Sequence, residues 1–280
     1  MKEKNLKTKI NLIKQKITGL SKSQLFLSPK IEYKFQKEID LAIKRLKNWE
    51  PVEYIINNAE FYSLDFYVNN NVLTPRNDTE IMVDKAIETI VNIPKKINKE
   101  PNITLIDIWT WSSCIAISIL KNTFKINNSY VIDISEKALE ISKKNIKLHN
   151  LENKIKIIHW SLLENFLLDK NYNLDKNIVI TANLPYIKNN DFDNIDKETI
   201  QFEPALALYW WKKTWFELYE QLINQIIKLK KENKEKNIYL FIEIWFDQKV
   251  YSKKYLDNLD LKFEIFKDNW WIYRCIKILF

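Results

Sequence analysis

Hydrophobic residues in the first fifty positions recur every three or four residues, as they do on one face of a helix. Two such series are present: Leu6, Ile10, Ile13 and Ile17, and then Phe35, Ile39, Ile43 and Leu46. A polar, proline-containing stretch over 21–30 separates the two series. The pattern predicts a small helical region with a break at this stretch.

Residues 59–75 follow a shorter period. Aromatic and β-branched side chains occupy roughly alternate positions in "AEFYSLDFYVNNNVLTP". Alternation of this kind is typical of strands that bury one face. We therefore expect a short β-hairpin that joins the helical region to the rest of the chain.

From residue 78 onward, strand-like apolar runs alternate with helical patterns, which predicts an α/β domain with a mostly parallel sheet covered on both faces. Strands are expected over 103–108, 129–133, 154–159, 177–182, 238–244, 261–266 and 272–279. Helices are expected after Asp78 and over 112–122, 135–149 and 215–234. Asp78 and Ser135 are the expected N-caps of two of these helices. The last two strands follow each other without a helix, so they are expected to pair antiparallel at one edge.

Ligands of open α/β sheets bind at the carboxyl ends of the strands. Four predicted strands end at Asp107, Asp133, His159 and Ala182. The loops that follow these residues are therefore expected to surround one site.

Composition narrows the classes of protein that the chain can be. No apolar run is long enough to span a membrane and the N-terminus is charged, so a cytoplasmic location without a membrane partner is expected. Cys114 and Cys275 are predicted to be buried free thiols, and with His149 and His159 as the only histidines no metal site is expected. The net charge of +8 is spread along the chain, so no direct nucleic-acid partner is expected.

The chain has one glycine and ten tryptophans, whereas average usage would give about 20 glycines. Two tryptophans interrupt "DIWTWSS" (107–113), between a predicted strand and a predicted helix. The others stand at segment ends, in "NWEP", "HWS", "YWWKKTW", "IWFD" and "DNWWIY". Every position suits glycine better: D-I-G-T-G-S-S, for example, is a turn that brings backbone N–H groups and a helix N-terminus to a ligand.

We interpret the ten tryptophans as glycines encoded by UGA and translated with a table that reads this codon as Trp. Some bacterial lineages read UGA as glycine, and the Lys-, Asn- and Ile-rich composition indicates an AT-rich genome. The alternative is true tryptophans in a core or on a binding face. Indoles at Trp109 and Trp111 are expected either to splay outward or to block the loop.

The segment Asn183-Leu184-Pro185-Tyr186 follows a predicted strand at the ligand edge. An amide or aromatic amine nitrogen is a poor nucleophile because its lone pair is delocalised. The Asn183 side-chain oxygen and the Leu184 carbonyl can accept its two N–H groups, which aims the lone pair at an electrophile. Pro185 stiffens the turn, and the Tyr186 ring can pack on a planar group.

Together with the 109–113 loop, these residues resemble the release-factor glutamine methyltransferases (the HemK/PrmC family). The likeness extends over nearly the whole chain. It includes "WEPVEYI" (49–55), "EFYSLDFYV" (60–68), "VLTPRNDTE" (72–80), "LIDIWTWSSCIAISIL" (105–120), "NLPYI" (183–187) and "QFEPALAL" (201–208). The family has mostly glycine where this chain has tryptophan.

The resemblance implies a Rossmann-like class I methyltransferase domain with a seven-stranded, mostly parallel sheet, preceded by a small helical domain. It implies S-adenosylmethionine as the methyl donor, with Asp133 on the ribose, Ser161 and Leu162 along the adenine, and further cofactor contacts from Trp109, Thr110, Trp111, Ser112, Ser113 and Asn183. It implies that the glutamine of a Gly-Gly-Gln motif binds Asn183, Leu184, Pro185 and Tyr186, of which Asn183 and Tyr186 are catalytic.

Three residues depart from the family pattern: Leu184 stands for its first proline, Ser113 for a third glycine and Ser161 for a common aspartate. Ser113 is expected to weaken cofactor packing, and Ser161 is expected to affect adenine recognition. The segments "PRNDTE" and "QFEP" also carry residues whose role stays open between a site wall and a structural anchor or cap: Arg76, Asp78, Glu80, Glu203 and Pro204.

The expected organisation is a helical, substrate-binding region over 1–58, a hairpin linker over 59–75 and a methyltransferase domain over 76–280, in a monomer. The expected partner is the release factor that reads UAA and UAG, because a lineage that decodes UGA as glycine cannot terminate there. Three alternatives remain open. They are an adenine-N6 methyltransferase acting on rRNA or DNA, a glutamine methyltransferase acting on a ribosomal protein, and an inactive binding module with its cofactor site filled by indoles.

Overall fold

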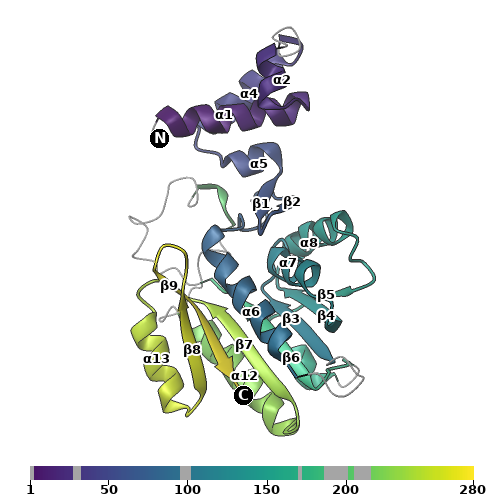
Figure 1. The fold of residues 1–280 in the computed structure, drawn as a ribbon, viewed down its shortest axis with the longest axis vertical. Coiled ribbons are helices and arrows are strands. Elements are labelled where there is room, and N and C mark those ends of the chain that lie inside the picture. The colour runs from purple at the N-terminus through teal and green to yellow at the C-terminus, as the bar shows by residue number, and fades with distance from the viewer. Residues whose placement is uncertain (1–2, 28–32, 95–101, 170–171, 186–200, 205–215) are drawn as a thin grey trace.

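The computed structural model describes residues 3–27, 33–94, 102–169, 172–185, 201–204 and 216–280. A group of helices lies at one end of the molecule, and a two-stranded hairpin connects it to a larger α/β domain (Figure 1). Both halves follow the change of period seen in the sequence, from helical spacing to alternating strands and helices.

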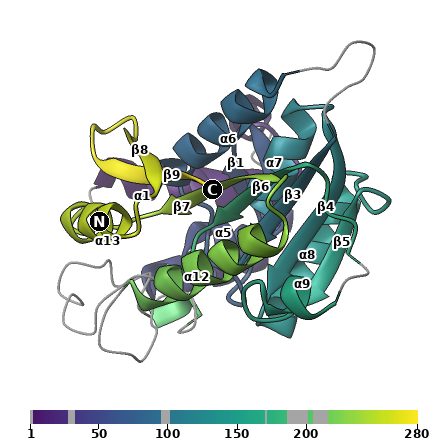
Figure 2. The same ribbon diagram turned by 90° about the horizontal axis from the view of Figure 1, so that it is seen from below.

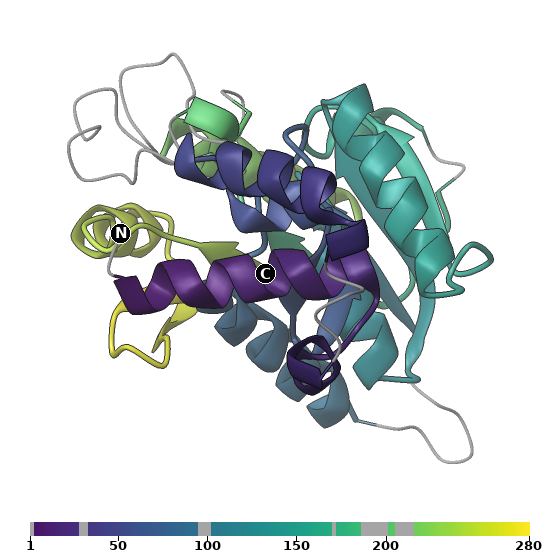
Figure 3. The same ribbon diagram turned by 90° about the horizontal axis from the view of Figure 1, so that it is seen from above.

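The N-terminal helices pack around a small apolar core of their own. They are α1 (Glu3–Thr18), α2 (Lys22–Leu27), α4 (Gln36–Lys47) and α5 (Val52–Ile56). Ile13 of α1 packs with Ala42 and Leu46 of α4 and with Val52 of α5, and α1 and α4 lie side by side in the view from above (Figure 3). The predicted break over 21–30 is partly wrong, because Lys22–Leu27 forms a short helix that buries Leu25.

The predicted hairpin is present over the first half of 59–75, as β1 (Ala59–Phe61) and β2 (Leu64–Phe66), whereas residues 67–75 form no strand. Its two-residue turn places Tyr62 at φ 51° and Ser63 at φ 58°, the positive values that such tight turns require. Phe61 and Phe66 are buried on the inner face with ring centroids 6.3 Å apart. The alternation of apolar positions therefore marks the buried side of the hairpin, as predicted.

A seven-stranded sheet forms the centre of the larger domain, in the order β5-β4-β3-β6-β7-β9-β8. The strands are β3 (Ile103–Ile108), β4 (Ile126–Asp133), β5 (Ile155–His159), β6 (Asn177–Ala182), β7 (Asn237–Glu243), β8 (Lys262–Lys267) and β9 (Tyr273–Leu279). All seven predicted strands are confirmed. β8 and β9 form the expected antiparallel pair, and β9 also pairs antiparallel with β7.

Helices cover both faces of this sheet, with α6 and α7 on one face and α12 on the other (Figure 2). The elements are the 3-10 turn η1 (Asn77–Thr79) and the helices α6 (Glu80–Asn92), α7 (Cys114–Asn122), α8 (Glu136–Leu148), α9 (Glu164–Leu168), α12 (Glu217–Glu232) and α13 (Lys249–Asn258). Every residue of β3 and β6 is buried, as expected of central parallel strands. The helices α9 and α13 were not predicted.

The two predicted helix caps have different outcomes. Ser135 caps α8, because its hydroxyl accepts a hydrogen bond from the Ala138 N–H at 3.2 Å. Asp78 does not cap α6: it lies in η1, the cap position belongs to Thr79, and the Asp78 carboxylate pairs with Arg274 at 3.1 Å. The carboxylate therefore binds a guanidinium on β9 rather than a helix N-terminus.

The order of the strands fixes the position of the ligand edge. The chain runs from β3 outward to β4 and β5, and then returns to the other side of β3 with β6. Ile108 and Ala182 are register partners at the ends of β3 and β6. The loops after these two residues therefore begin side by side at the topological switch point, where ligands of open α/β sheets bind.

Candidate functional site

The loop after β3 has a backbone that favours glycine. Trp109, Trp111 and Ser113 have φ values of 59°, 51° and 62°, in the left-handed region that side chains with a Cβ rarely adopt. The Ser113 N–H donates to the Thr110 carbonyl at 2.7 Å, which closes the turn just before α7. The path of this loop is that of a glycine-rich turn, although none of its residues is glycine.

Asp107 ties this loop to the sheet. Its carboxylate accepts hydrogen bonds from the hydroxyl of Thr110 at 2.5 Å and from that of Thr181 on β6 at 2.7 Å. Complete burial raises the pKa of Asp107 to about 6, against the opposing effect of these hydrogen bonds. One buried carboxyl group thus connects β3, the loop and β6.

Asp133 joins the loop from the next strand. One carboxylate oxygen accepts the Trp111 N–H at 2.9 Å, and the other accepts the Ser135 N–H at 2.9 Å. Burial raises the pKa of Asp133 to about 7. Each carboxylate oxygen retains a further lone pair, so this group can accept hydroxyl donors beside the loop.

Asn183 and Leu184 leave the end of β6 and are buried, with 6% and 1% of their surface exposed. The Asn183 side-chain nitrogen donates to the hydroxyl of Thr79 at 3.5 Å. The Leu184 N–H donates to the hydroxyl of Tyr219 at 3.2 Å. Pro185 is buried as well. Tyr186 lies outside the described residues.

The indoles of Trp109 and Trp111 fill the space between the loop and Asn183. Both side chains are buried, at 2% and 5% exposure, with ring centroids 6.2 Å apart. The Trp111 Nε1 donates to the Asn183 carbonyl at 3.4 Å. The indoles therefore block the loop rather than splay outward. The carboxyl acceptor and the backbone path suit a nucleoside ligand, but these two side chains do not leave room for one.

Ser161 and Leu162 follow β5. The Trp160 N–H donates to the Asp133 carbonyl at 3.0 Å, so this turn begins beside the end of β4. Leu162 is buried and has φ 53°, whereas Ser161 is half-buried. The predicted site residues at 109–113, Asp133 and Asn183 are directly linked by hydrogen bonds, and Ser161 and Leu162 lie one strand further out.

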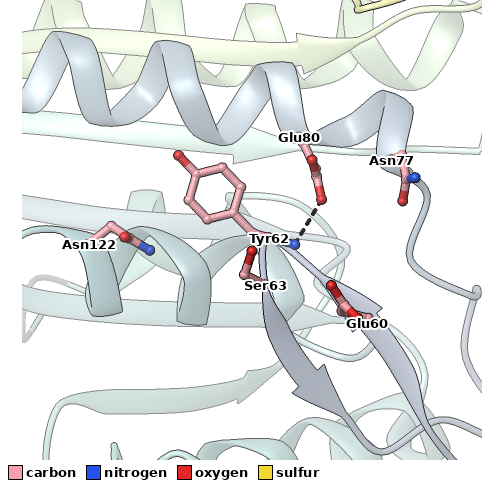
Figure 4. Close-up of a pocket in the computed structure, with 6 residues that line it drawn as sticks. All are labelled: Glu60, Tyr62, Ser63, Asn77, Glu80 and Asn122. Atoms are coloured by element: carbon pink, nitrogen blue, oxygen red, sulfur yellow. Dashed lines mark hydrogen bonds between the residues drawn. The ribbon is translucent and has the colours of Figure 1, made fainter. Parts of the chain in front are cut away.

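Three charged residues of "PRNDTE" act as anchors. Arg76 pairs with Glu203 at 2.6 Å, and burial raises the pKa of Glu203 although Arg76 opposes the shift. Asp78 binds Arg274, as described above. The Glu80 carboxylate accepts the Tyr62 N–H at 2.8 Å (Figure 4). These contacts support a role as structural anchors for Arg76, Asp78 and Glu80.

Glu80 also borders a polar pocket of about 700 Å³ at the junction of the hairpin, η1, α6 and α7. Figure 4 shows its lining side chains: Glu60, Tyr62, Ser63, Asn77, Glu80 and Asn122. The Tyr62 hydroxyl donates to Asp84 at 2.7 Å. These contacts hold the hairpin against α6 and thereby position the segment that contains Thr79.

Three residues that support the site were not predicted from the sequence, namely Thr79, Tyr219 and Asn145. The Asn145 side chain donates to the Ser112 carbonyl at 2.9 Å and to the Tyr67 carbonyl at 3.0 Å, and it accepts the Tyr67 N–H at 2.7 Å. It thus ties the loop before α7 to the segment after the hairpin. An asparagine among the apolar positions of a predicted helix is a signal, because a buried amide requires partners.

Cys114 and Cys275 are buried free thiols, as predicted. Within the described ranges, no group of three His, Cys, Asp or Glu side chains is arranged to hold a metal ion. The helices of the same ranges are all too short or too polar to cross a membrane.

The chain is similar to known proteins over most of its length. It is 34% identical over 252 residues to a release factor glutamine methyltransferase of Mycoplasma mycoides, covering 88% of this chain and 82% of the relative. It is 32% identical over 209 residues to one of Flavobacterium psychrophilum, covering 74% and 69% of the two chains. No protein-family model matches the chain.

Solved structures with the same fold are more distant in sequence. The N-terminal domain of human METTL16 is 15% identical and superposes with a TM-score of 0.54, covering 78% of this chain and 75% of that one. The same domain in complex with SAH is 14% identical, with a TM-score of 0.53 and coverage of 78% and 76%. The sheet order and these neighbours identify the Rossmann-like fold of class I methyltransferases, as predicted.

Proposed function

Because the chain belongs to the release factor glutamine methyltransferases, we propose that it transfers a methyl group from S-adenosylmethionine to a peptide chain release factor. The acceptor is the side-chain amide nitrogen of the glutamine in the Gly-Gly-Gln motif. The observation that carries this proposal is the position of Asn183-Leu184 beside the 109–113 loop, at the switch point between β3 and β6. The residues proposed to bind the acceptor amide then lie next to the loop proposed to bind the methyl donor.

The residues of the site have separate roles in this reaction. S-adenosylmethionine, when bound, supplies a methyl group on a sulfonium sulfur. The Asn183 side-chain oxygen and the Leu184 carbonyl accept the two N–H hydrogens of the glutamine amide and aim its nitrogen at the methyl carbon. The nitrogen loses its proton to solvent after the transfer. Tyr186 is proposed to pack on the planar amide.

The remaining residues bind the cofactor. Asp133 is proposed to accept hydrogen bonds from the ribose hydroxyls, and Thr110, Ser112 and the backbone of the loop to approach the rest of the molecule. Ser161 and Leu162 are proposed to line the adenine. This arrangement requires that positions 109 and 111 carry no side chain.

We further propose that the tryptophans are glycines in the cell, encoded by UGA. Seven of the ten lie in the described residues. Four of the seven have positive φ: Trp49 at 69°, Trp109 at 59°, Trp111 at 51° and Trp271 at 63°. Such angles occur in a few per cent of residues other than glycine. At the β8–β9 turn, Trp270 and Trp271 are 75% and 79% exposed, which also suits a glycine turn better than two indoles.

Two measurements test the decoding. The first is the DNA sequence: UGA at the ten positions supports the proposal, and UGG at Trp109 and Trp111 contradicts it. The second is calorimetric titration with S-adenosylhomocysteine of two proteins. One is the printed chain, which has tryptophan at all ten positions, and the other is its Trp109→Gly/Trp111→Gly variant. The variant is expected to bind and the printed chain is not, whereas the Trp270→Gly/Trp271→Gly control is expected to behave like the printed chain.

The proposed partner follows from the decoding. A cell that reads UGA as glycine retains only the release factor that reads UAA and UAG, so this factor is the proposed substrate. The proposed location is the cytoplasm, where this factor works. The enzyme is proposed to act as a monomer, with the helices of 1–58 helping to hold the factor and 59–75 joining them to the catalytic domain over 76–280. A functional UGA-reading factor in the same genome would contradict both the partner and the decoding.

The inactive binding module is the second candidate, because the buried indoles of Trp109 and Trp111 occupy the proposed cofactor site. The titration above separates it from an enzyme. Methyl-transfer assays with release factor, rRNA and ribosomal proteins as alternative acceptors separate the proposed substrate from those of the other two alternatives.

A further inference from the structure

We infer that Tyr219 is a positioning residue for the Asn183-Leu184 peptide, and that it takes over a restraint that a proline would supply at position 184. The inference rests on the proposed function for its catalytic consequence, but the restraint itself is a property of the fold. The family pattern has proline where this chain has Leu184. Proline fixes φ near −65° and has no N–H, whereas Leu184 has a free φ and a buried N–H that needs an acceptor.

The hydroxyl of Tyr219 is that acceptor. The Leu184 N–H donates to it at 3.2 Å, and the same hydroxyl donates to the Glu243 carbonyl at the end of β7 at 2.5 Å. A hydroxyl has one proton, and the Glu243 carbonyl can only accept it. The direction of both hydrogen bonds is therefore fixed, from Leu184 to Tyr219 to Glu243.

This relay is buried throughout. Leu184 and Tyr219 are each 1% exposed, and Glu243 is 3% exposed. Burial raises the pKa of Tyr219 well above its usual value, so the hydroxyl keeps its proton at any pH at which the protein is assayed. Tyr219 lies on α12, and its ring packs against that of Phe216, with ring centroids 5.2 Å apart. Water is not available to replace the hydroxyl as an acceptor for the Leu184 N–H.

The relay matters for catalysis because the proposed acceptor of the substrate N–H is the carbonyl of the same residue, Leu184. A hydrogen bond to its N–H restrains φ at this residue, which the missing proline ring would have done covalently. Loss of the hydroxyl would leave a buried N–H without a partner and allow the peptide to rotate away from it. The acceptor carbonyl would then be misplaced, while the loop that binds the cofactor on the other side would be unaffected.

The test is a double-mutant cycle in the glycine-restored chain, in which all ten tryptophans are glycine. Tyr219→Phe is expected to lower kcat for release-factor methylation about tenfold, with KM for S-adenosylmethionine unchanged. In a Leu184→Pro background, which has no N–H to satisfy, Tyr219→Phe is expected to change kcat less than twofold. Tyr255→Phe is the control, because its ring also lies against Phe216, at 5.9 Å, and its loss of a hydroxyl is expected to leave kcat unchanged.

Equal losses on Tyr219→Phe in both backgrounds would overturn the inference, since Tyr219 would then act independently of the Leu184 N–H. Amide hydrogen exchange at Leu184 provides a readout that needs neither activity nor the proline variant. Exchange at this one amide is expected to accelerate at least tenfold in Tyr219→Phe and not in Tyr255→Phe, and an unchanged rate would also overturn the inference. If the restored parent transfers no methyl group, the proposed function fails, and the exchange measurement still decides whether the relay exists.

Discussion

The side-chain nitrogen of Asn183 donates to the hydroxyl of Thr79, 3.5 Å away across 104 positions of sequence. The donor end of the amide is thereby assigned to the protein, and the oxygen is left to accept an N–H of the proposed substrate. Thr79 is itself buried between η1 and α6. The "PRNDTE" segment thus contributes to the site through an uncharged residue, while its charged residues bind elsewhere in the protein.

Substitutions at this pair should separate orientation from chemistry. In the glycine-restored chain, Asn183→Ala is expected to lower kcat about 10²- to 10³-fold, the cost of losing one preorganised hydrogen-bonding group. Thr79→Val is expected to lower it three- to tenfold, because Asn183 can then rotate, and Thr79→Ser is expected to retain activity. Cofactor affinity measured by calorimetry should stay within twofold in the two Thr79 variants. An equal kcat in Thr79→Val and Thr79→Ser would contradict the orienting role.

Ser113 is the departure from the loop pattern that decoding does not explain, and its φ of 62° is costly for serine. Its hydroxyl contacts those of Ser142 at 2.5 Å and Thr110 at 3.1 Å, which offsets part of the cost. In a Ser142→Ala background, Ser113→Gly is expected to raise the free energy of unfolding by about 1 kcal/mol, because glycine adopts this φ without strain.

Ser113→Ala is the matched control for this experiment. It removes the hydroxyl but keeps the Cβ in the left-handed region, so it is expected to destabilise the protein in either background. Thermal unfolding of the four variants measures both effects. Equal stability of the glycine and alanine variants would show that the backbone angle at this position carries no strain.

The pair between Arg76 and Glu203 is expected to stabilise the protein chiefly by preventing an unpaired buried carboxylate. The Glu203 side chain is 1% exposed and that of Arg76 is 44% exposed. Arg76→Met is therefore expected to lower the free energy of unfolding by about 1–3 kcal/mol. Adding Glu203→Gln should recover most of this loss in denaturant titrations, and failure of the double variant to recover would indicate that Arg76 stabilises through its other contacts.

The raised pKa of Asp133 predicts that the free energy of unfolding of the printed chain depends on pH. Its pKa is raised from 3.8 to about 7 by burial, so between these values the folded state binds a proton that the unfolded state has lost. The free energy of unfolding therefore falls as pH rises from about 4 to 7, by an amount on the order of a few kcal/mol. Stability is greatest at the acidic end of this window, and above pH 7 the contribution of this group no longer changes.

Asp133→Asn should remove that part of the slope, which urea unfolding at several pH values measures. Asp107, whose pKa is raised to about 6, gives a slope of the same sign in both proteins and so serves as the common background. Glycine at 109 and 111 would open the site to solvent and reduce the slope from Asp133. An equal slope in the parent and Asp133→Asn would contradict the buried, protonated carboxyl group.

The sequence predicted the elements of the sheet because the apolar runs of β3 and β6 are buried at every position and have no other arrangement that hides them. It also located the switch point, since that follows from alternating strands and helices. It did not predict α13, whose sequence has only Ser252 and Leu256 buried and thus a weak periodic pattern.

The partners of polar side chains were harder to predict than the elements. Asp78 is of a residue type that often caps helices, but its carboxylate binds Arg274, nearly two hundred positions away, instead of a helix N-terminus. Thr79, Asn145 and Tyr219 support the site through hydrogen bonds between segments that only the fold brings together. Periodicity identifies which face is buried, and it contains no information on which buried polar groups meet.

The most direct test of the account is mass spectrometry of a release factor of the UAA/UAG-reading class after incubation with S-adenosylmethionine and the glycine-restored chain. One added methyl group is expected on the glutamine of the Gly-Gly-Gln motif, none on a factor with alanine in its place, and none when the chain with ten tryptophans replaces the restored one. Methylation of rRNA or a ribosomal protein in place of the factor, or no methylation by a folded restored chain, would contradict it.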